Sequence, residues 1–234
     1  MNRSKTDQES SILRAGQVVG SLVDAVKWGR AGAAAVGEQC DIVEFRVEAL
    51  GGQMGAVAEA MAACPLPVLL TVRAEEEGGL AALDGAARRA IFAALLPQAA
   101  LVDVELAHFG TLSSVVAEAR ERGIPVVASF HDFAGTASLA ALESLVGRAQ
   151  EAGAAAVKFA TFLRGSGDLA VLAALQESAP LPLATMGMGP LGRVSRLLLA
   201  SLGSVLNYGY LDQPTVAGQW SAPRLRELLR ELSP

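Results

Sequence analysis

The sequence predicts an α/β fold of the (β/α)₈ barrel class, a TIM barrel with a polar N-terminal tail. Three observations lead to this prediction: β-type runs recur at a regular interval, a stretch with helical periodicity follows each, and eight such units fit into 234 residues. A chain of this length is typical of one closed barrel, and eight units favour it over an open doubly wound sheet. No linker divides the sequence, so we expect one domain over residues 1–234, with residues 1–14 as a flexible tail.

The expected strands are short runs rich in Val, Leu, Ile and Ala. In chain order they are Gln17–Leu22, Ile42–Arg46, Val68–Val72, Leu101–Glu105, Pro125–Phe130, Ala155–Ala160, Leu181–Met186 and Ser204–Tyr208. The intervening helical stretches include Asp84–Leu96, Thr111–Arg122, Ser138–Ala152 and Pro223–Leu232. The first strand has the weakest pattern because it follows the polar tail, and we expect the barrel to be irregular there.

The composition is apolar, with 52% hydrophobic residues and a mean hydropathy of +0.38. A membrane protein is not expected, because the longest uncharged stretches, such as Leu197–Leu211, are interrupted by Gly, Ser, Asn and Tyr. Parallel strands buried on both faces account for the composition instead. A net charge of −5 without a basic run argues against nucleic-acid binding. The polar first ten residues and the two cysteines, Cys40 and Cys64, favour a cytoplasmic protein with reduced core thiols.

Polar side chains gather where the predicted strands end. Glu44 and Arg46 close the second strand, Asp103 and Glu105 the fourth, and residues two apart on a strand point the same way. The other strand ends and following loops contribute Thr71, Arg73, Glu77, His131, Lys158, Thr185, Thr215 and Gln219. Catalytic groups of (β/α)₈ barrels come from this end of the strands. The sequence therefore predicts an active site there.

Two of these residues suggest a chemistry by themselves. Lys158 lies within the apolar run 154–160, where desolvation would favour the neutral amine that a nucleophile needs. An ion-paired structural lysine is the alternative. His131 closes the fifth strand and suits proton transfer in both directions near pH 7, although a structural histidine is equally compatible with its position. The second histidine, His108, is expected on the surface.

Seven motifs stand at seven different strand ends: E-x-R at Glu44, T-x-R-x-x-x-E-G-G at Thr71, D-V-E at Asp103, S-x-H-D-F-x-x-T at Ser129, V-K-F-A at Val157, M-G-M-G-x-x-G-x-x-S-R at Met186, and A-G-Q at Ala217. Together they resemble the type I 3-dehydroquinate dehydratases, which are Schiff-base-forming carbon–oxygen lyases of the shikimate pathway. Each motif is weak alone, but their shared order over residues 44–219 makes the resemblance specific.

The resemblance implies roles for ten residues. Lys158 is expected to form a Schiff base with the C3 ketone of 3-dehydroquinate, His131 to act as general acid and base, and Glu77 to orient His131. The product would be 3-dehydroshikimate. Substrate-binding roles are implied for Glu44, Arg46, Arg73, Met186, Arg196, Thr215 and Gln219, with Arg196 holding the carboxylate and the last two in a closing loop. The resemblance implies no cofactor and no metal. It implies a homodimer that binds a small-molecule substrate.

The sequence departs from the family pattern in the closing loop, which reads Thr215-Val216-Ala217-Gly218-Gln219 without the usual proline, and at Glu48 and Ala137, where Asp and Pro are usual. Two alternatives follow: a catalytically impaired homologue that binds a shikimate-type ligand, and another class I aldolase barrel that uses a lysine Schiff base. An aldolase would leave S-x-H-D-F and the Gly-Gln loop without a role.

Overall fold

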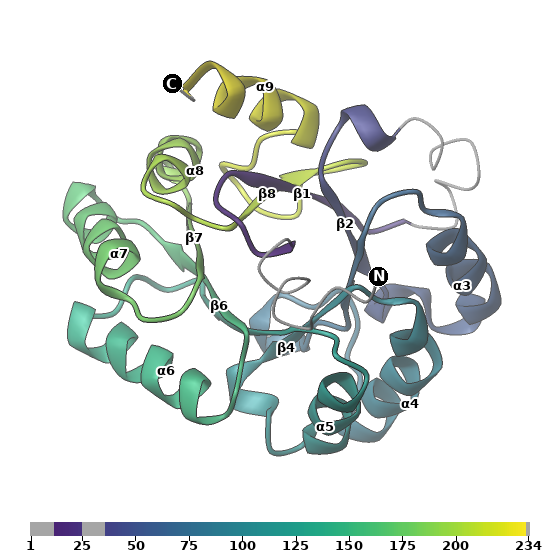
Figure 1. Ribbon diagram of the computed structural model, residues 1–234. Coiled ribbons are helices and arrows are strands. Elements are labelled where there is room, and N and C mark those ends of the chain that lie inside the picture. Colours follow the sequence, from purple (N-terminus) through teal and green to yellow (C-terminus); the bar gives the residue numbers. More distant parts are fainter. Residues whose placement is uncertain (1–11, 25–35, 233–234) are drawn as a thin grey trace, which may run out of the picture.

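The computed structural model describes residues 12–24 and 36–232 and contains eight parallel strands in a nearly closed barrel surrounded by helices (Figure 1). The predicted fold class is confirmed. The strands are β1 Gln17–Leu22, β2 Ile42–Arg46, β3 Val68–Thr71, β4 Leu101–Glu105, β5 Val126–Asp132, β6 Ala156–Phe162, β7 Leu183–Met188 and β8 Leu206–Tyr210. They pair in the order β7-β6-β5-β4-β3-β2-β1-β8.

The barrel is open along one seam. Among the described strands, β7 and β8 stand at the two ends of the pairing order and form no ladder with each other, and a backbone hydrogen bond from Val205 N–H to Leu183 O (2.9 Å) links their N-terminal ends. The expected irregularity at the first strand was wrong, because β1 pairs in regular parallel register with both β2 and β8. The irregular place is therefore on the other side of β8.

The helices lie on the outside of the barrel, where Figure 1 shows them as a ring around the strands. They are α3 Met54–Ala63, α4 Gly85–Leu95, α5 Ser113–Glu121, α6 Leu139–Glu151, α7 Ser166–Ser178, α8 Gly192–Ser201 and α9 Ala222–Leu232. The 3₁₀ turns are η1 Val36–Glu38, η2 Glu48–Gln53, η3 Glu75–Glu77, η4 Leu96–Gln98 and η5 Leu106–His108. Asp84 caps α4 by accepting the Ala87 N–H at 2.7 Å, which fixes where that helix begins.

Four strands end later than the sequence predicted. β5 to β8 each extend two residues further, because ladder pairs such as His131–Ala160 and Phe162–Met188 continue past the expected ends. His131 consequently belongs to a strand and not to the loop after it. The ladder with β6 holds its backbone through the pair His131–Ala160, and Glu77 accepts its backbone N–H, which makes it a rigid support for a functional side chain.

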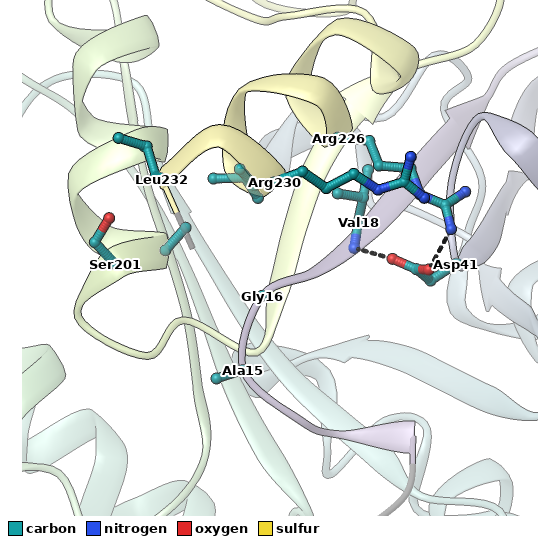
Figure 2. A pocket seen from close by; sticks show the side chains of 10 residues that line it. Ala15, Gly16, Val18, Asp41, Ser201, Arg226, Arg230 and Leu232 are labelled. Carbon is teal, nitrogen blue, oxygen red and sulfur yellow. Dashed lines mark hydrogen bonds and ion pairs between the residues drawn. The ribbon is translucent and has the colours of Figure 1, made fainter. Parts of the chain in front are cut away.

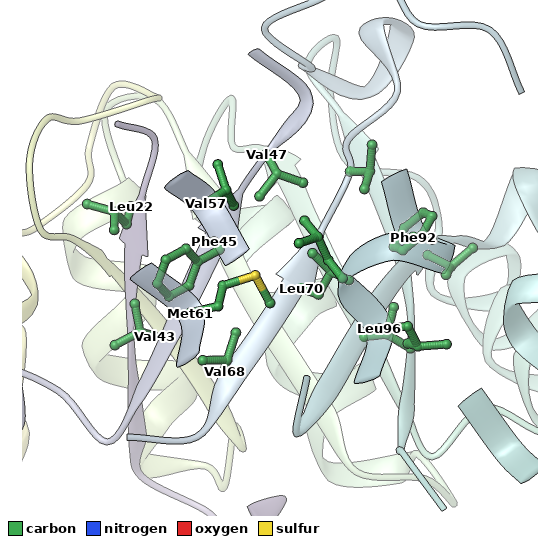
Figure 3. Close-up of a cluster of buried hydrophobic side chains, with 14 of the residues drawn as sticks. Leu22, Val43, Phe45, Val47, Val57, Met61, Val68, Leu70, Phe92 and Leu96 are labelled. Carbon is green, nitrogen blue, oxygen red and sulfur yellow. The ribbon is translucent and has the colours of Figure 1, made fainter. Parts of the chain in front are cut away.

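Alternation along the strands separates two cores. Outward-facing residues pack under the helices, where Figure 3 shows Phe45 and Leu70 of the sheet meeting Met61 of α3 and Phe92 of α4. Inward-facing apolar residues fill the N-terminal half of the lumen; they are Val19, Ile42, Leu69, Leu101, Val127, Ala156, Ala184 and Leu206. Leu13, which we had placed in the flexible tail, is 8% exposed and packs into this inner cluster, whereas residues 1–11 lie outside the described part.

This apolar layer fills the N-terminal half of the lumen, and the charged inward-facing residues of the described strands lie in the C-terminal half. None of the helices in the described ranges is long and apolar enough to cross a membrane.

Candidate active site

All ten residues predicted for the site line one pocket at the C-terminal end of the barrel. The complete lining is Ser21, Glu44, Arg46, Arg73, Glu77, Gly78, His131, Phe133, Lys158, Ala160, Met186, Met188, Arg196, Tyr208, Thr215, Val216 and Gln219. These residues come from six strands, β1, β2 and β5 to β8, from α8 and from the loops after β3, β5 and β8. The geometry brings the predicted residues together; their chemical roles remain predictions.

Lys158 projects from β6 into the lumen and is 4% exposed. Its Nζ donates a hydrogen bond to Asp103 Oδ2 at 3.1 Å and lies 3.7 Å from Glu44 Oε1. The apolar surroundings suggested by the sequence were wrong, because Val157 and Phe159 face away from the lumen while carboxylates from β2 and β4 reach the amine. In the described structure Lys158 is therefore buried and ion-paired at the same time.

The two carboxylates beside Lys158 are held in place by other side chains. Glu44 accepts hydrogen bonds from Ser21 Oγ and from Thr71 Oγ1, the latter at 2.9 Å. Burial opposes the ionisation of Glu44, but Lys158 and Arg46 outweigh it and hold the pKa of this carboxyl below its ordinary value. Asp103 behaves similarly: burial is outweighed by Arg73 and Lys158, so its pKa lies well below its usual range.

Arg73 braces the floor of this cluster. Its guanidinium lies 2.8 Å from Asp103 Oδ1 and 3.1 Å from Glu105 Oε1, and it donates to Ser129 Oγ at 2.6 Å. Arg88 approaches Glu105 from outside the barrel and also donates to the Val72 carbonyl. With two carboxylate partners, Arg73 is occupied within the protein, which fits a bracing role better than a direct substrate contact.

Arg46 also lines the pocket, but its partners differ from those of Arg73. Its Nε donates to Glu48 Oε1 at 2.8 Å, and Nη2 donates to the carbonyl of Gly78 at 2.9 Å. Glu48 also accepts the backbone N–H of Arg73 at 3.3 Å. The departure from Asp at position 48 thus keeps a carboxylate on Arg46, because the longer side chain still reaches it.

His131 and Glu77 form a pair at the mouth of the pocket. Nδ1 of His131 lies 2.9 Å from Glu77 Oε2, and the same oxygen accepts the backbone N–H of His131 at 3.0 Å. Burial raises the pKa of Glu77 to about 7, with Arg73 opposing this rise. Burial, together with Arg73 and Lys158, lowers the pKa of His131 well below its ordinary value. When Nδ1 donates to Glu77, Nε2 of a neutral His131 is left with a lone pair that can accept a proton.

Arg196 is a buried guanidinium that forms no ion pair with any described carboxylate. It is 3% exposed, and Nη1 donates to the Tyr208 carbonyl at 2.9 Å and contacts Met186 Sδ at 3.3 Å. Its Nε has no hydrogen-bond partner in the described structure, and burial lowers its pKa to about 10. Arg196 thus spans the seam between β7 and β8 and presents uncompensated positive charge to the pocket, as an anion-binding site requires.

The loop after β8 covers one side of the pocket. Gln219 Oε1 accepts the backbone N–H of Thr215 at 3.0 Å, which closes this loop on itself. Gly218 has φ +83, and a Cβ placed on it would lie 2.7 Å from the Gly189 carbonyl oxygen. Gly189 in turn donates to the Ala217 carbonyl at 3.3 Å. Only glycine fits this approach of the closing loop to the loop after β7.

Sequence reasoning missed several residues of the site. Asp103 was recognised within D-V-E but received no role, although it is the nearest carboxylate to Lys158. Phe133, 47% exposed, was quoted in S-x-H-D-F without a function. Ser21 and Tyr208 sit on strands with no polar motif, and no sequence signal distinguished them. The ring centroid of Tyr208 lies 4.1 Å from Lys158 Nζ.

A larger cavity, of about 510 Å³, opens at the N-terminal end of the barrel between β1, α8 and α9 (Figure 2). There Asp41 accepts the Val18 N–H at 2.9 Å and pairs with Arg226 at 3.0 Å. These contacts pair both charges within the protein, and Lys158, His131 and Arg196 all lie at the other end of the barrel. The volume of a cavity therefore does not identify the candidate active site in this protein. Within the described ranges no group of three or more His, Cys, Asp or Glu is placed to hold a metal ion.

Comparison with known proteins agrees with this geometry. A model of the family described as type I 3-dehydroquinase matches residues 23–233. The 3-dehydroquinate dehydratase of Halobacterium salinarum is 36% identical over 223 residues, covering 89% of this chain and 96% of the relative. The crystal structure of 3-dehydroquinate dehydratase from Geobacillus kaustophilus superposes with a TM-score of 0.83 at 27% identity, covering 92% of this chain and 90% of that one.

The type I enzyme from Clostridium difficile, whose structure is described as containing covalently modified comenic acid, superposes with a TM-score of 0.81 at 26% identity. It covers 94% of this chain and 92% of its own. With a family match over nearly the whole chain, and with the family's motifs gathered around one pocket, this chain belongs to the type I 3-dehydroquinase family.

Proposed function

We propose that this chain dehydrates 3-dehydroquinate to 3-dehydroshikimate, as a lyase of the shikimate pathway, through a Schiff base on Lys158 with His131 as general acid and base. The observation that carries the proposal is the combination in one pocket of three groups: a buried lysine, a histidine hydrogen-bonded to a carboxylate, and a buried arginine without an anionic partner among the described residues. A keto acid of this kind needs each of them.

The substrate carboxylate would bind Arg196. An unpaired buried guanidinium is costly, and a carboxylate relieves that cost by bringing opposite charge and acceptor oxygens together. Binding there would place the rest of the ring toward Lys158, because Arg196 contacts Met186 and Tyr208, which line the same wall of the pocket.

The covalent step begins with Lys158. Its ammonium gives a proton to solvent water, the neutral Nζ attacks the C3 carbonyl carbon, and the hydroxyl of the resulting carbinolamine takes up a proton and leaves as water to give a protonated imine. This cation withdraws electrons from the adjacent C2–H bond and makes its proton removable. Asp103 and Glu44, both ionised, compensate the positive charge that remains on Nζ.

Elimination then needs one group that accepts a proton and returns one. Nε2 of His131 takes the C2 proton, and the electron pair forms an enamine. The C1 hydroxyl departs as water with a proton from His131, which generates the C1–C2 double bond and restores the iminium. Hydrolysis of the iminium releases 3-dehydroshikimate and frees Lys158. Glu77 holds the imidazole in the required tautomer.

The test is an ultraviolet assay of the purified protein with 3-dehydroquinate that follows the conjugated product. Borohydride added during turnover should leave a permanent mass adduct on Lys158, and the variant Lys158→Met should show neither turnover nor adduct. A flat trace from folded wild-type protein would favour the ligand-binding homologue. An active enzyme whose Lys158 stays unmodified would contradict the covalent mechanism.

We also propose that the chain works as a cytoplasmic homodimer. Val194 and Leu198, one turn apart on α8, are 56% and 39% exposed and form an apolar strip suited to contact with a second copy. The two free cysteines suit a reducing compartment. Light scattering should give a molar mass of twice the chain mass of 24.1 kDa. The variant Val194→Asp should lower the measured mass to that of a single chain. A wild-type mass of 24.1 kDa at micromolar concentration would contradict the dimer, and recovery of the native protein outside the cytosolic fraction would contradict the compartment.

A further inference from the structure

Tyr208 contacts both ends of the proposed chemistry. Its ring lies across Lys158, with 4.1 Å between the ring centroid and Nζ, while its backbone carbonyl accepts a hydrogen bond from Arg196 at 2.9 Å. Tyr208 is 3% exposed and lies in the middle of β8, between apolar Leu206 and the pocket mouth. The side chain therefore meets the nucleophile, and the main chain meets the arginine.

The hydroxyl of Tyr208 is the unexpected part. It is buried, and no described group forms a hydrogen bond with it, an arrangement that costs free energy in a protein interior. Burial, with Glu44 and Asp103 nearby, holds the pKa of Tyr208 well above its ordinary value, so the phenol is neutral. Because nothing anchors the tip of the side chain, its specific contact with the site is made by the face of the ring.

We propose that Tyr208 is a positioning residue whose ring face holds the cationic nitrogen of Lys158, first as ammonium and then as the iminium. This inference rests on the proposed Schiff-base function of Lys158. The face of an aromatic ring attracts a cation but cannot accept its proton.

The carboxylates beside Lys158 cannot replace this contact. An ammonium has three N–H donors for Asp103 and Glu44, whereas the protonated imine keeps one. Hydrogen bonding to the carboxylates therefore weakens as the imine forms, while the attraction of the ring for the positive charge persists. Tyr208 holds the nitrogen in one place through the step at which its hydrogen bonding to the carboxylates weakens.

The test compares Tyr208→Phe, which keeps the ring, with Tyr208→Leu, which fills space without a π face. Loss of the ring contact should lower kcat by about 3- to 30-fold. It should also move the acid limb of borohydride trapping to lower pH by roughly 0.4 to 1.5 units, because the ammonium loses stabilisation. The phenylalanine variant should keep the wild-type kcat and the wild-type pH of the acid limb. Its melting temperature should be no lower than that of the wild type, because it removes an unpaired hydroxyl.

Other charged groups near Lys158 are unchanged in both variants: Glu44, Asp103, Arg73 and His131. A shift of the limb is thus attributable to the ring. Tyr210→Leu, on the same strand but outside the pocket lining, is the matched control and should leave the limb in place. Tyr208→Met provides a second ring-free variant should the leucine variant fail to fold.

Two outcomes would overturn the inference: a folded leucine or methionine variant with unchanged kcat and limb, or a phenylalanine variant as impaired as these, which would assign the role to the hydroxyl. Absence of any adduct in the wild-type protein is a different result, because it contradicts the Schiff base itself.

Discussion

Glu77 Oε2 binds His131 twice, at Nδ1 (2.9 Å) and at the backbone N–H (3.0 Å), so one carboxylate oxygen holds both the imidazole and the backbone of the residue that carries it. Glu77 comes from η3, after β3, and the contact bridges β3 and β5 across the mouth of the pocket. A base held at two points needs little reorganisation when it moves a proton.

Replacing His131 with Ala should separate the covalent step from the elimination. In the proposed mechanism imine formation uses Lys158 and should continue, whereas loss of the proposed general acid and base should lower kcat by about 10²- to 10⁴-fold. Mass spectrometry after borohydride treatment measures the first step, and the ultraviolet assay measures the second. Near-normal turnover in His131→Ala would mean that another group removes the proton.

Glu77 should make stability depend on pH. Its pKa rises from 4.5 unfolded to about 7 folded, so its favourable contribution is complete below pH 4.5 and is lost as the pH rises through 7. Glu77→Gln mimics the protonated form and should abolish a decline on the order of 2–3 kcal/mol between pH 4.5 and 8. Urea unfolding of both proteins at several pH values measures the difference, and parallel curves would contradict the raised pKa.

Arg196→Met should raise KM without destabilising the protein. The guanidinium has no described anionic partner, so its loss removes a buried charge, and the free energy of unfolding should stay constant or rise. The lost carboxylate contact should raise KM by about 10- to 100-fold. Calorimetry and steady-state kinetics test both halves. A variant that is strongly destabilised would show that Arg196 has a structural counter-ion in solution.

Gly218→Ala should impair the closing loop specifically. A methyl group at φ +83 and 2.7 Å from the Gly189 oxygen forces the loop away from its neighbour, at a cost of about 1–3 kcal/mol in the closed arrangement. We expect kcat/KM to fall about 5- to 100-fold while the melting temperature changes little, because the loop is peripheral to the core. Gly37→Ala, with open space around its Cβ position, is the control.

Phe92→Ala provides the opposite case. Phe92 is fully buried between α4 and the sheet, far from the pocket lining, and its truncation should cost about 3–5 kcal/mol of unfolding free energy. At a temperature where the variant is folded, KM should remain at the wild-type value. An altered KM would indicate that the outer core and the pocket are coupled.

Much of the fold was predictable because a strand run followed by a helical stretch repeats eight times and seven of these units carry a polar motif near the strand end, and a local signal that recurs so often constrains the topology. The ten predicted site residues meet because parallel strands deliver their C-terminal ends to one face. Lys158 shows where this reasoning fails: its chain neighbours point outward, and its real partners, Glu44, Asp103 and Tyr208, come from strands far along the chain. Because side chains alternate between the two faces of a strand, the residues next to Lys158 in sequence do not predict its partners in space.

The open seam could not be predicted either, since ladder closure depends on the tilt and stagger of all eight strands. It has a mechanical consequence. Because β7 and β8 lack a ladder, the barrel has one compliant joint, and Arg196 crosses it. A ligand bound covalently to Lys158 on β6 and ionically to Arg196 would link the protein on both sides of this seam. The loaded enzyme should therefore be stiffer than the empty one, and backbone amides along the seam should exchange with deuterium more slowly.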